Sequence, residues 1–280
     1  MKPGRAILIY AVVVVLLGAL LAPWLFWLVQ ATGVEALTRH PFRRVFNRSV
    51  MIVALVGLWP LVRTLGIRSW SALGYPRRAG WWREILVGAA LATGSLVVAF
   101  VLTGRSVDWE NSKYTVAGAL ASVTATAVVV AFIEETFFRG AIQGALQRAW
   151  RGPVALAVAS AVYSALHFLK PKGAHIAPES VTWRSGLDCL GQVVTASLLD
   201  EKVGVAFVSL LLVGLILGWT FQRTGALYWA LGLHGGWVVA NEFVRKFRGG
   251  NLVQEPVAWV VLLITWAVVA WRCRNHTKTW

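Results

Sequence analysis

Residues 115–140 read TVAGALASVTATAVVVAFIEETFFRG, and this stretch decides both the fold class and where function should be sought. The nineteen residues 115–133 carry no charge, which is typical of a helix that crosses a membrane. Two carboxylates, Glu134 and Glu135, follow at once, and Arg139 comes four residues after the second. Each acidic side chain at the centre of a bilayer costs roughly 2.5–3.5 kcal/mol. Three ionisable groups beside this run therefore indicate a functional site.

The composition of the whole chain is that of a membrane protein. Of its 280 residues, 58% are hydrophobic and only 14% are charged, and the mean hydropathy is +0.65. Apolar runs long enough to cross a hydrocarbon layer of roughly 30 Å recur along the chain. We therefore predict an all-α fold, a polytopic membrane bundle of about eight transmembrane helices, near residues 6–29, 49–67, 85–104, 114–148, 153–170, 203–222, 226–248 and 256–272.

The chain is strongly basic, with a formal net charge of +15. Its basic residues are spread over every loop, so we expect them to contact the anionic headgroups of the bilayer and not nucleic acid. Tryptophans support this interpretation, because their amphipathic rings prefer the membrane interface. They occur at or near the ends of the predicted spans, at Trp24, Trp27, Trp70, Trp81, Trp82, Trp150, Trp229 and Trp271.

The sequence shows no soluble domain, repeat or low-complexity tract. We divide it into N-terminal transmembrane helices with an interfacial segment (residues 1–113), a helical core (114–248), and a last transmembrane helix with a basic tail (249–280). The interfacial segment is residues 68–84, which are rich in Trp, Tyr, Pro and Arg. Residues 169–201 are interpreted as a loop with an interfacial helix, or as a re-entrant lid over a site.

The spacing of the charged residues separates the two acids. On a helix, Glu135 and Arg139 are four residues apart, so they share a face and can form an ion pair. Glu134 points about 100° away from Glu135. Arg139 therefore neutralises Glu135 and leaves Glu134 available for proton chemistry.

A partner for Glu134 is found among the histidines that fall inside apolar runs, His167 and His234. The predicted helices 114–148 and 153–170 form a hairpin that turns near residues 149–152. Glu134 lies 14 residues before Arg148, and His167 lies 15 residues after Gly152. At 1.5 Å of rise per residue, both are roughly 21–22 Å from the turn. This equal depth predicts a Glu134–His167 pair.

The predicted helix at residues 226–248 does not place its histidine clearly at the depth of Glu134 and His167. It begins near Ala226 on the same side, which places His234 about 12 Å deep. His234 reaches the level of Glu134 only if the 149–152 turn protrudes from the membrane. Asn241, two turns further along, is nominally closer in depth.

At these motifs the chain resembles the CPBP family, which comprises CAAX-protease, bacteriocin-processing and abortive-infection-like intramembrane peptidases. The motifs that carry the resemblance are EETFFRG, with Glu134, Glu135 and Arg139; Tyr163 followed by His167; and LHGGW, with His234. The resemblance covers residues 114–245. It implies a glutamic-type endopeptidase in a multi-pass membrane protein, and we expect the cytoplasmic membrane of a prokaryote.

The resemblance also implies roles for these residues. Glu134 and His167 would activate a water molecule, while Glu135 and Arg139 would support and orient the site. His234 would help to bind the oxyanion of the tetrahedral intermediate. The expected partner is a membrane-associated protein or peptide substrate: a prenylated CaaX protein, a bacteriocin leader or a C-terminal sorting tail.

One departure from the family pattern concerns the oxyanion. Where an Asn commonly follows the last histidine by four residues, this chain has Val238, whose side chain donates no hydrogen bond. Loss of one such donor typically lowers the rate by 10²–10³. Asn241 is the candidate substitute. Val238 also motivates a second hypothesis, a non-catalytic CPBP-like protein that binds and regulates a membrane partner.

Two further interpretations stay open. A proton-coupled transporter would use the acids and histidines as a relay, but the inverted repeats typical of such folds are not visible in the sequence. A glutamate with two histidines could ligate zinc. No His-Glu-x-x-His motif is present, and Arg139 opposes a second cation beside the acids. We therefore expect a site without cofactor or metal, with a bound ion as the alternative.

Overall fold

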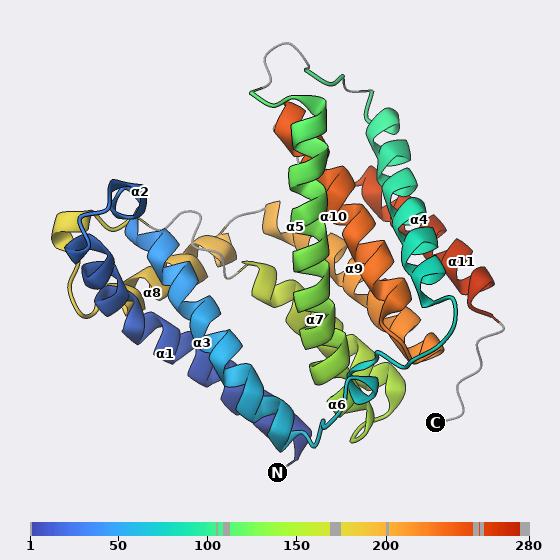
Figure 1. Cartoon of the computed structure of the whole chain (residues 1–280), viewed down its shortest axis with the longest axis horizontal. Coiled ribbons are helices and arrows are strands. Elements are labelled where there is room, and N and C mark those ends of the chain that lie inside the picture. Colours follow the sequence, from blue (N-terminus) through green and yellow to red (C-terminus); the bar gives the residue numbers. More distant parts are fainter. Residues whose placement is uncertain are drawn as a thin grey trace. The chain divides into compact units, whose positions relative to one another are not determined.

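The computed structural model describes residues 2–104, 106–108, 113–168, 175–199, 202–248, 252 and 255–274 (Figure 1). Throughout these ranges the regular structure is helical, and no strand occurs in them. The predicted all-α fold is therefore confirmed.

Each of the eight predicted spans corresponds to a helix. The long helices are α1 (Pro3–Ala31), α3 (Phe42–Thr64), α4 (Trp81–Leu102), α5 (Val116–Glu135), α7 (Gly152–Phe168), α9 (Lys202–Thr224), α10 (Tyr228–Arg248) and α11 (Val257–Arg272). Helix α5 continues without a break through η2 (Thr136–Gln143) and α6 (Gly144–Gln147). The shorter elements are α2 (Glu35–Thr38), η1 (Ser71–Leu73), η3 (Pro178–Ser180) and α8 (Ser185–Leu199).

Within the described residues, five helical segments are long and apolar enough to cross a membrane: Pro3–Ala31, Phe42–Thr64, Trp81–Leu102, Val116–Gln147 and Gly204–Thr224. Helix α11 and residues 152–167 of α7 are apolar but shorter. The number of eight spans is therefore not confirmed. Large apolar side chains remain exposed along these helices, for example at Leu8, Val56, Val101, Val128 and Val260, as expected for helices in contact with lipid.

The chain divides into two compact units, and the division falls inside α7. The first unit is Met1–Arg68 with Ala165–Val203, and the second is Ser69–Ser164 with Gly204–Trp280. The domain bounds predicted at residues 113 and 248 stay a prediction.

In the first unit, α8 packs against α1 and α3. Its buried Cys189 joins a cluster that includes Phe26 of α1 and Phe42 of α3. A side chain at Gly186 would collide with the backbone of Ala19, so only glycine permits this close approach of α8 to α1. The predicted helix within residues 169–201 is confirmed as α8, while residues 169–174 and 200–201 of that stretch lie outside the described residues.

In the second unit, α10 packs against α4 on one side and α5 on another (Figure 1). The contact with α4 is made by small residues one turn apart, which let the two backbones approach closely. A Cβ at Gly232 would run into the carbonyl of Ile85, and one at Gly236 would meet that of Ala89. The carbonyl of Gly236 also accepts a hydrogen bond from Thr93 Oγ1, at 3.2 Å.

The segment before α4 is fixed to the start of α10. The backbone N–H of Leu227 donates to the carbonyl of Gly74 at 2.8 Å, and the hydroxyl of Tyr228 donates to the carbonyl of Pro76, also at 2.8 Å. Gly74 adopts φ +96°, a left-handed conformation that favours glycine. We call residues 69–80 the interfacial loop; its middle is bonded directly to the helix that carries His234.

The close α4–α10 contact predicts different effects for two glycines of α10. Gly232→Ala should lower the free energy of unfolding by about 1–3 kcal/mol, because its new methyl group meets the backbone of α4. Gly235→Ala is the matched control, because a Cβ there meets nothing within 4 Å. It should be neutral or stabilising. Thermal unfolding of both purified variants checks this, and equal unfolding midpoints would contradict the close packing.

Candidate active site

The EETFFRG motif spans a change in helix type. Helix α5 begins at Val116, where the side chain of Thr115 caps it by accepting from the N–H of Gly118 at 3.2 Å. It remains an α-helix through Glu135, and the following residues, Thr136–Gln143, form a π-helix. Such π segments are rare and are frequent at functional sites. The motif's acids therefore lie at the end of the α-helical part, and Arg139 lies in the wider winding.

Glu135 and Arg139 form the ion pair that their spacing predicts. The two atoms Arg139 Nη1 and Glu135 Oε1 are 2.8 Å apart, and the side chains are 2% and 0% exposed. Because a buried charge without a partner is very costly, each of these residues depends on the other. The predicted pairing is thus confirmed.

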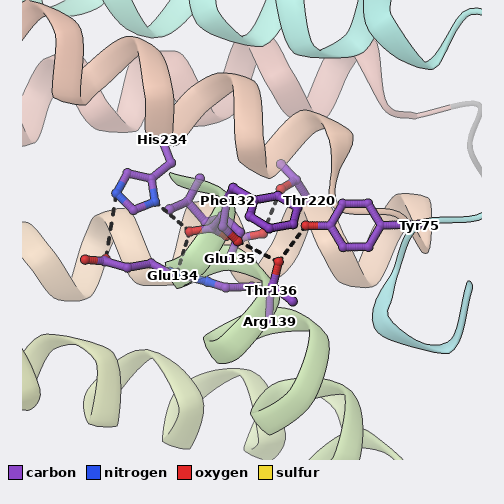
Figure 2. A network of polar contacts seen from close by, with 9 residues as sticks. Tyr75, Phe132, Glu134, Glu135, Thr136, Arg139, Thr220 and His234 are labelled. Carbon is purple, nitrogen blue, oxygen red and sulfur yellow. Dashed lines mark hydrogen bonds and ion pairs between the residues drawn. The ribbon is translucent and has the colours of Figure 1, made fainter. Parts of the chain in front are cut away.

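His234 lies between the two acids of the motif (Figure 2). Its Nδ1 donates to Oε1 of Glu135 at 2.7 Å, so this one carboxylate oxygen accepts from both His234 and Arg139. On the other edge of the ring, Nε2 is 3.9 Å from Oε2 of Glu134. The structure therefore brings His234 to the level of the acids, which the depth count left conditional.

Tyr163 of α7 completes the aromatic side of this cluster. The guanidinium carbon of Arg139 lies 4.3 Å from the centre of the Tyr163 ring, a cation–π arrangement. The ring meets those of Phe138 and His234 edge to face, with centroid distances of 5.1 and 6.4 Å. Tyr163 is buried, so its ring fixes the orientation of both the arginine and the histidine.

His167 follows Tyr163 by one helical turn in α7, so the two side chains share a face of that helix. His167 belongs to the first compact unit, whereas Glu134 belongs to the second. The predicted Glu134–His167 pair therefore stays a prediction.

Asn241 is engaged away from the acids. Its side-chain oxygen accepts from the backbone N–H of Leu252 at 2.9 Å, which ties Leu252 to α10. It lies seven residues beyond His234, or about 10 Å along the axis. Its predicted role as an oxyanion donor stays a prediction. Val238, at the position typical of an asparagine, is half-buried in α10.

Two residues of the network were missed by the sequence analysis, Tyr75 and Thr136. The hydroxyl of Tyr75 lies 2.6 Å from Oγ1 of Thr136 (Figure 2). The hydroxyl of Thr136 in turn donates to the carbonyl of Phe132 at 2.5 Å. This chain of hydrogen bonds spans the junction between α5 and the π-helix. The only signal in the sequence was that Tyr75 lies in the predicted interfacial segment, and nothing there indicated its partner.

The π-helix is held by further contacts in the second unit. The side-chain amide of Gln143 donates to the carbonyl of Gly218 in α9 at 2.9 Å. On the side of the interfacial loop, a Cβ at Gly140 would come within 2.5 Å of the carbonyl of Leu73. These contacts from α9 and from the loop fix the position of Arg139.

Among the described residues, Oε2 of Glu135 and Nη2 of Arg139 have no hydrogen-bond partner. Both are buried, and buried polar atoms are nearly always bonded to protein, water or ligand. In the described part of the chain, no three His, Cys, Asp or Glu side chains gather as a metal site requires. The geometry thus offers carboxylate, imidazole and guanidinium groups to a polar ligand.

Comparison with known proteins gives a family match for the region that contains Glu134, Glu135, Arg139 and His234. Residues 116–240 match the family model described as type II CAAX prenyl endopeptidase Rce1-like. No curated protein and no solved structure matches the chain. The matched residues include both motif acids, Arg139 and both intrahelical histidines.

The buried phenol of Tyr75 predicts a pH-dependent contribution to stability. Burial raises the pKa of Tyr75 to about 12, from 10.0 in an unfolded chain. Tyr75→Phe should lower the free energy of unfolding by about 1 kcal/mol at neutral pH, because it removes the hydrogen bond to Thr136. The difference should be constant well below pH 10, shrink around pH 10 and reverse before pH 12, because the unfolded phenol ionises first and this effect over about two pH units outweighs one hydrogen bond.

Denaturant unfolding of the protein and the variant across this pH range measures the difference. A difference that is unchanged between neutral pH and pH 11 would show that the Tyr75 phenol is not shielded by the fold.

Proposed function

We propose that the chain, whose residues 116–240 are an Rce1-like domain, is a glutamic-type endopeptidase that acts within the membrane. The observation that carries the proposal is the position of His234, which meets the carboxylates of Glu134 and Glu135 with its two ring nitrogens. A histidine between two acids inside an apolar helix bundle is costly to bury, and it provides groups for proton transfer and charge stabilisation.

In the proposed reaction, Glu134 is the general base. It takes a proton from water, and the resulting hydroxide attacks the carbonyl carbon of the scissile peptide bond. Its side chain keeps 26% exposure, whereas that of Glu135 is fully buried, so Glu134 is the better placed of the two acids to meet water. His167 partners Glu134 and delivers the proton to the leaving amine. The position of His167 one turn beyond Tyr163, which contacts Arg139 and His234, supports this assignment.

His234 stabilises the oxyanion, and its hydrogen bond determines in which form it does so. Because Nδ1 donates to Glu135, the neutral ring has only a lone pair on Nε2. Donation to an oxyanion therefore requires the imidazolium form.

Glu135 and Arg139 act by positioning. The single oxygen Oε1 of Glu135 holds both Arg139 and His234, so it sets the distance between the π-helix and α10. With that oxygen engaged by two donors, we favour a metal-free site. The peptide would be hydrolysed by protein groups and water alone.

The proposed substrate is a membrane-associated protein or peptide, and a prenylated CaaX protein, a bacteriocin leader and a C-terminal sorting tail are the candidate classes. Integral membrane placement follows from the apolar helices and the family. We place the protein in the cytoplasmic membrane of a prokaryote.

One observation favours a second function, a non-catalytic regulator that binds a membrane partner. Val238 offers no side-chain donor, and Asn241 lies seven residues beyond His234, about 10 Å along the helix axis. If no other group completes the oxyanion site, the same helices could still bind a partner. In that case substitution of Glu134 would leave the phenotype unchanged.

The peptidase proposal predicts that Glu134→Gln abolishes cleavage of a co-expressed membrane substrate. Removal of a general base typically lowers the rate by roughly 10²–10⁴. Glu242→Gln is the matched control: it removes a carboxylate from α10 that pairs with the exposed Arg245. Mass spectrometry of membrane proteins from cells with each variant identifies the product. Normal processing with Glu134→Gln, at normal protein level, would refute the peptidase.

The position of Val238 predicts a gain of activity. Val238→Asn places an amide donor one turn beyond His234, and one oxyanion donor is typically worth 10²–10³ in rate. We expect turnover to rise at least about ten-fold with little change in KM, because the new bond forms only with the oxyanion. Single-turnover cleavage of the substrate found in the preceding experiment measures this. Equal rates for the unchanged protein and Val238→Asn would show that a donor at position 238 does not reach the oxyanion.

A further inference from the structure

A pocket outside the site described above lies where the interfacial loop meets α4 and α10. It has a volume of about 420 Å³ and is lined by Arg77, Arg78, Ala79, Trp81 and Tyr228. Its size is within the range of roughly 300–1,000 Å³ that is common for small-ligand sites. The peptidase mechanism uses none of these residues.

The pocket lies at the level of the membrane interface. Trp81 is the first residue of α4, one of the helices long and apolar enough to cross a membrane. Its side chain and that of Trp82 are 45% and 48% exposed, as for aromatic rings at the headgroup level. The pocket is therefore open to the headgroup layer.

The lining is arranged for an anion. The guanidinium of Arg78 lies 5.3 Å from the centre of the Tyr228 ring and forms an ion pair with Glu84, which holds it in place. Its Nε is buried and has no hydrogen-bond partner in the described part of the chain. Arg77 is exposed, so the two arginines against one glutamate leave a positive charge. A guanidinium fork matches the oxygens of a phosphate group.

Helix α4 adds to this field. Its N-cap is Gly80, which has no side chain to accept from the first N–H groups of the helix. These groups and the helix dipole favour a negative charge near Trp81. The exposed Arg77 and the N-terminus of α4 thus both favour a negative charge in the pocket.

We propose that this pocket binds the phosphate group of an anionic membrane lipid. The acyl chains would lie along the exposed apolar side of α4 while Arg77 and Arg78 bind the headgroup. This inference is independent of the peptidase proposal, because it concerns binding alone.

Occupancy would also stabilise the interfacial loop. Tyr228, in the wall of the pocket, is hydrogen-bonded to the carbonyl of Pro76, and the neighbouring Tyr75 is bonded to Thr136 of the π-helix. A headgroup bound by Arg77 and Arg78 would thus hold the loop against the helices that carry the candidate site.

The test measures the binding of short-chain phosphatidylglycerol to the full chain in neutral detergent, by native mass spectrometry. Arg77→Gln should weaken binding about five-fold, as expected for one arginine near an anionic surface. Because Arg77 is exposed, this variant keeps the Arg78–Glu84 pair and the fold. Arg83→Gln is the matched control: it removes the same charge from the first turn of α4, where Arg83 stacks on Trp82 and does not line the pocket. It should bind as the unchanged protein does.

Two further arms identify the source of the phosphate. Phosphatidylcholine should bind more weakly than phosphatidylglycerol, and millimolar inorganic phosphate should compete only weakly. Inorganic phosphate that binds in an Arg77-dependent manner without lipid would identify a soluble phosphate as the ligand of the same pocket. Equal affinities of Arg77→Gln and Arg83→Gln, or equal binding of both lipids, would overturn the proposal, since both results indicate a non-specific basic surface.

Discussion

The site depends on one buried carboxylate oxygen, Oε1 of Glu135, which accepts from Arg139 and from His234 at the same time. Breaking a buried ion pair by removing one partner typically costs 3–5 kcal/mol, because it leaves a charge without compensation. Any movement of α10 away from α5 would break one of these two bonds. The oxygen therefore couples the distance between the helices to the geometry of the acids.

The π-helix explains how neighbouring residues of one motif can have partners on different helices. The regular α-helix up to Glu135 presents both acids to His234. The wider π-helix that follows gives Arg139 and Gln143 separate partners. Arg139 bonds back to Glu135, while Gln143 bonds forward to Gly218 of α9. Such winding is uncommon in α-helical sequences. Here it is held by contacts on both sides, from the interfacial loop and from α9.

Much of this could be predicted from the sequence, and the failures have physical causes. Long charge-free runs predict helices, because a chain segment in lipid must satisfy its own backbone hydrogen bonds and a helix does so. The i,i+4 spacing predicted the Glu135–Arg139 pair, since that spacing is local. The depth count was less informative for His234. It assumed regular α-geometry, whereas residues 136–143 form a π-helix, and it could not include the tilt of α10. Tyr75 was missed because its bond to Thr136 joins residues 61 positions apart.

Gly232 and Gly236 help to position His234, because they set how closely α10 packs against α4. Successive residues of an α-helix are about 100° apart, so His234 points roughly opposite to Gly232 and Gly236. Those two glycines let α4 approach on one side, and His234 reaches Glu135 on the other. A close helix crossing and a functional histidine are therefore not competing explanations of the LHGGW motif. The crossing sets the depth and rotation of α10, and this rotation brings the ring of His234 between the two acids.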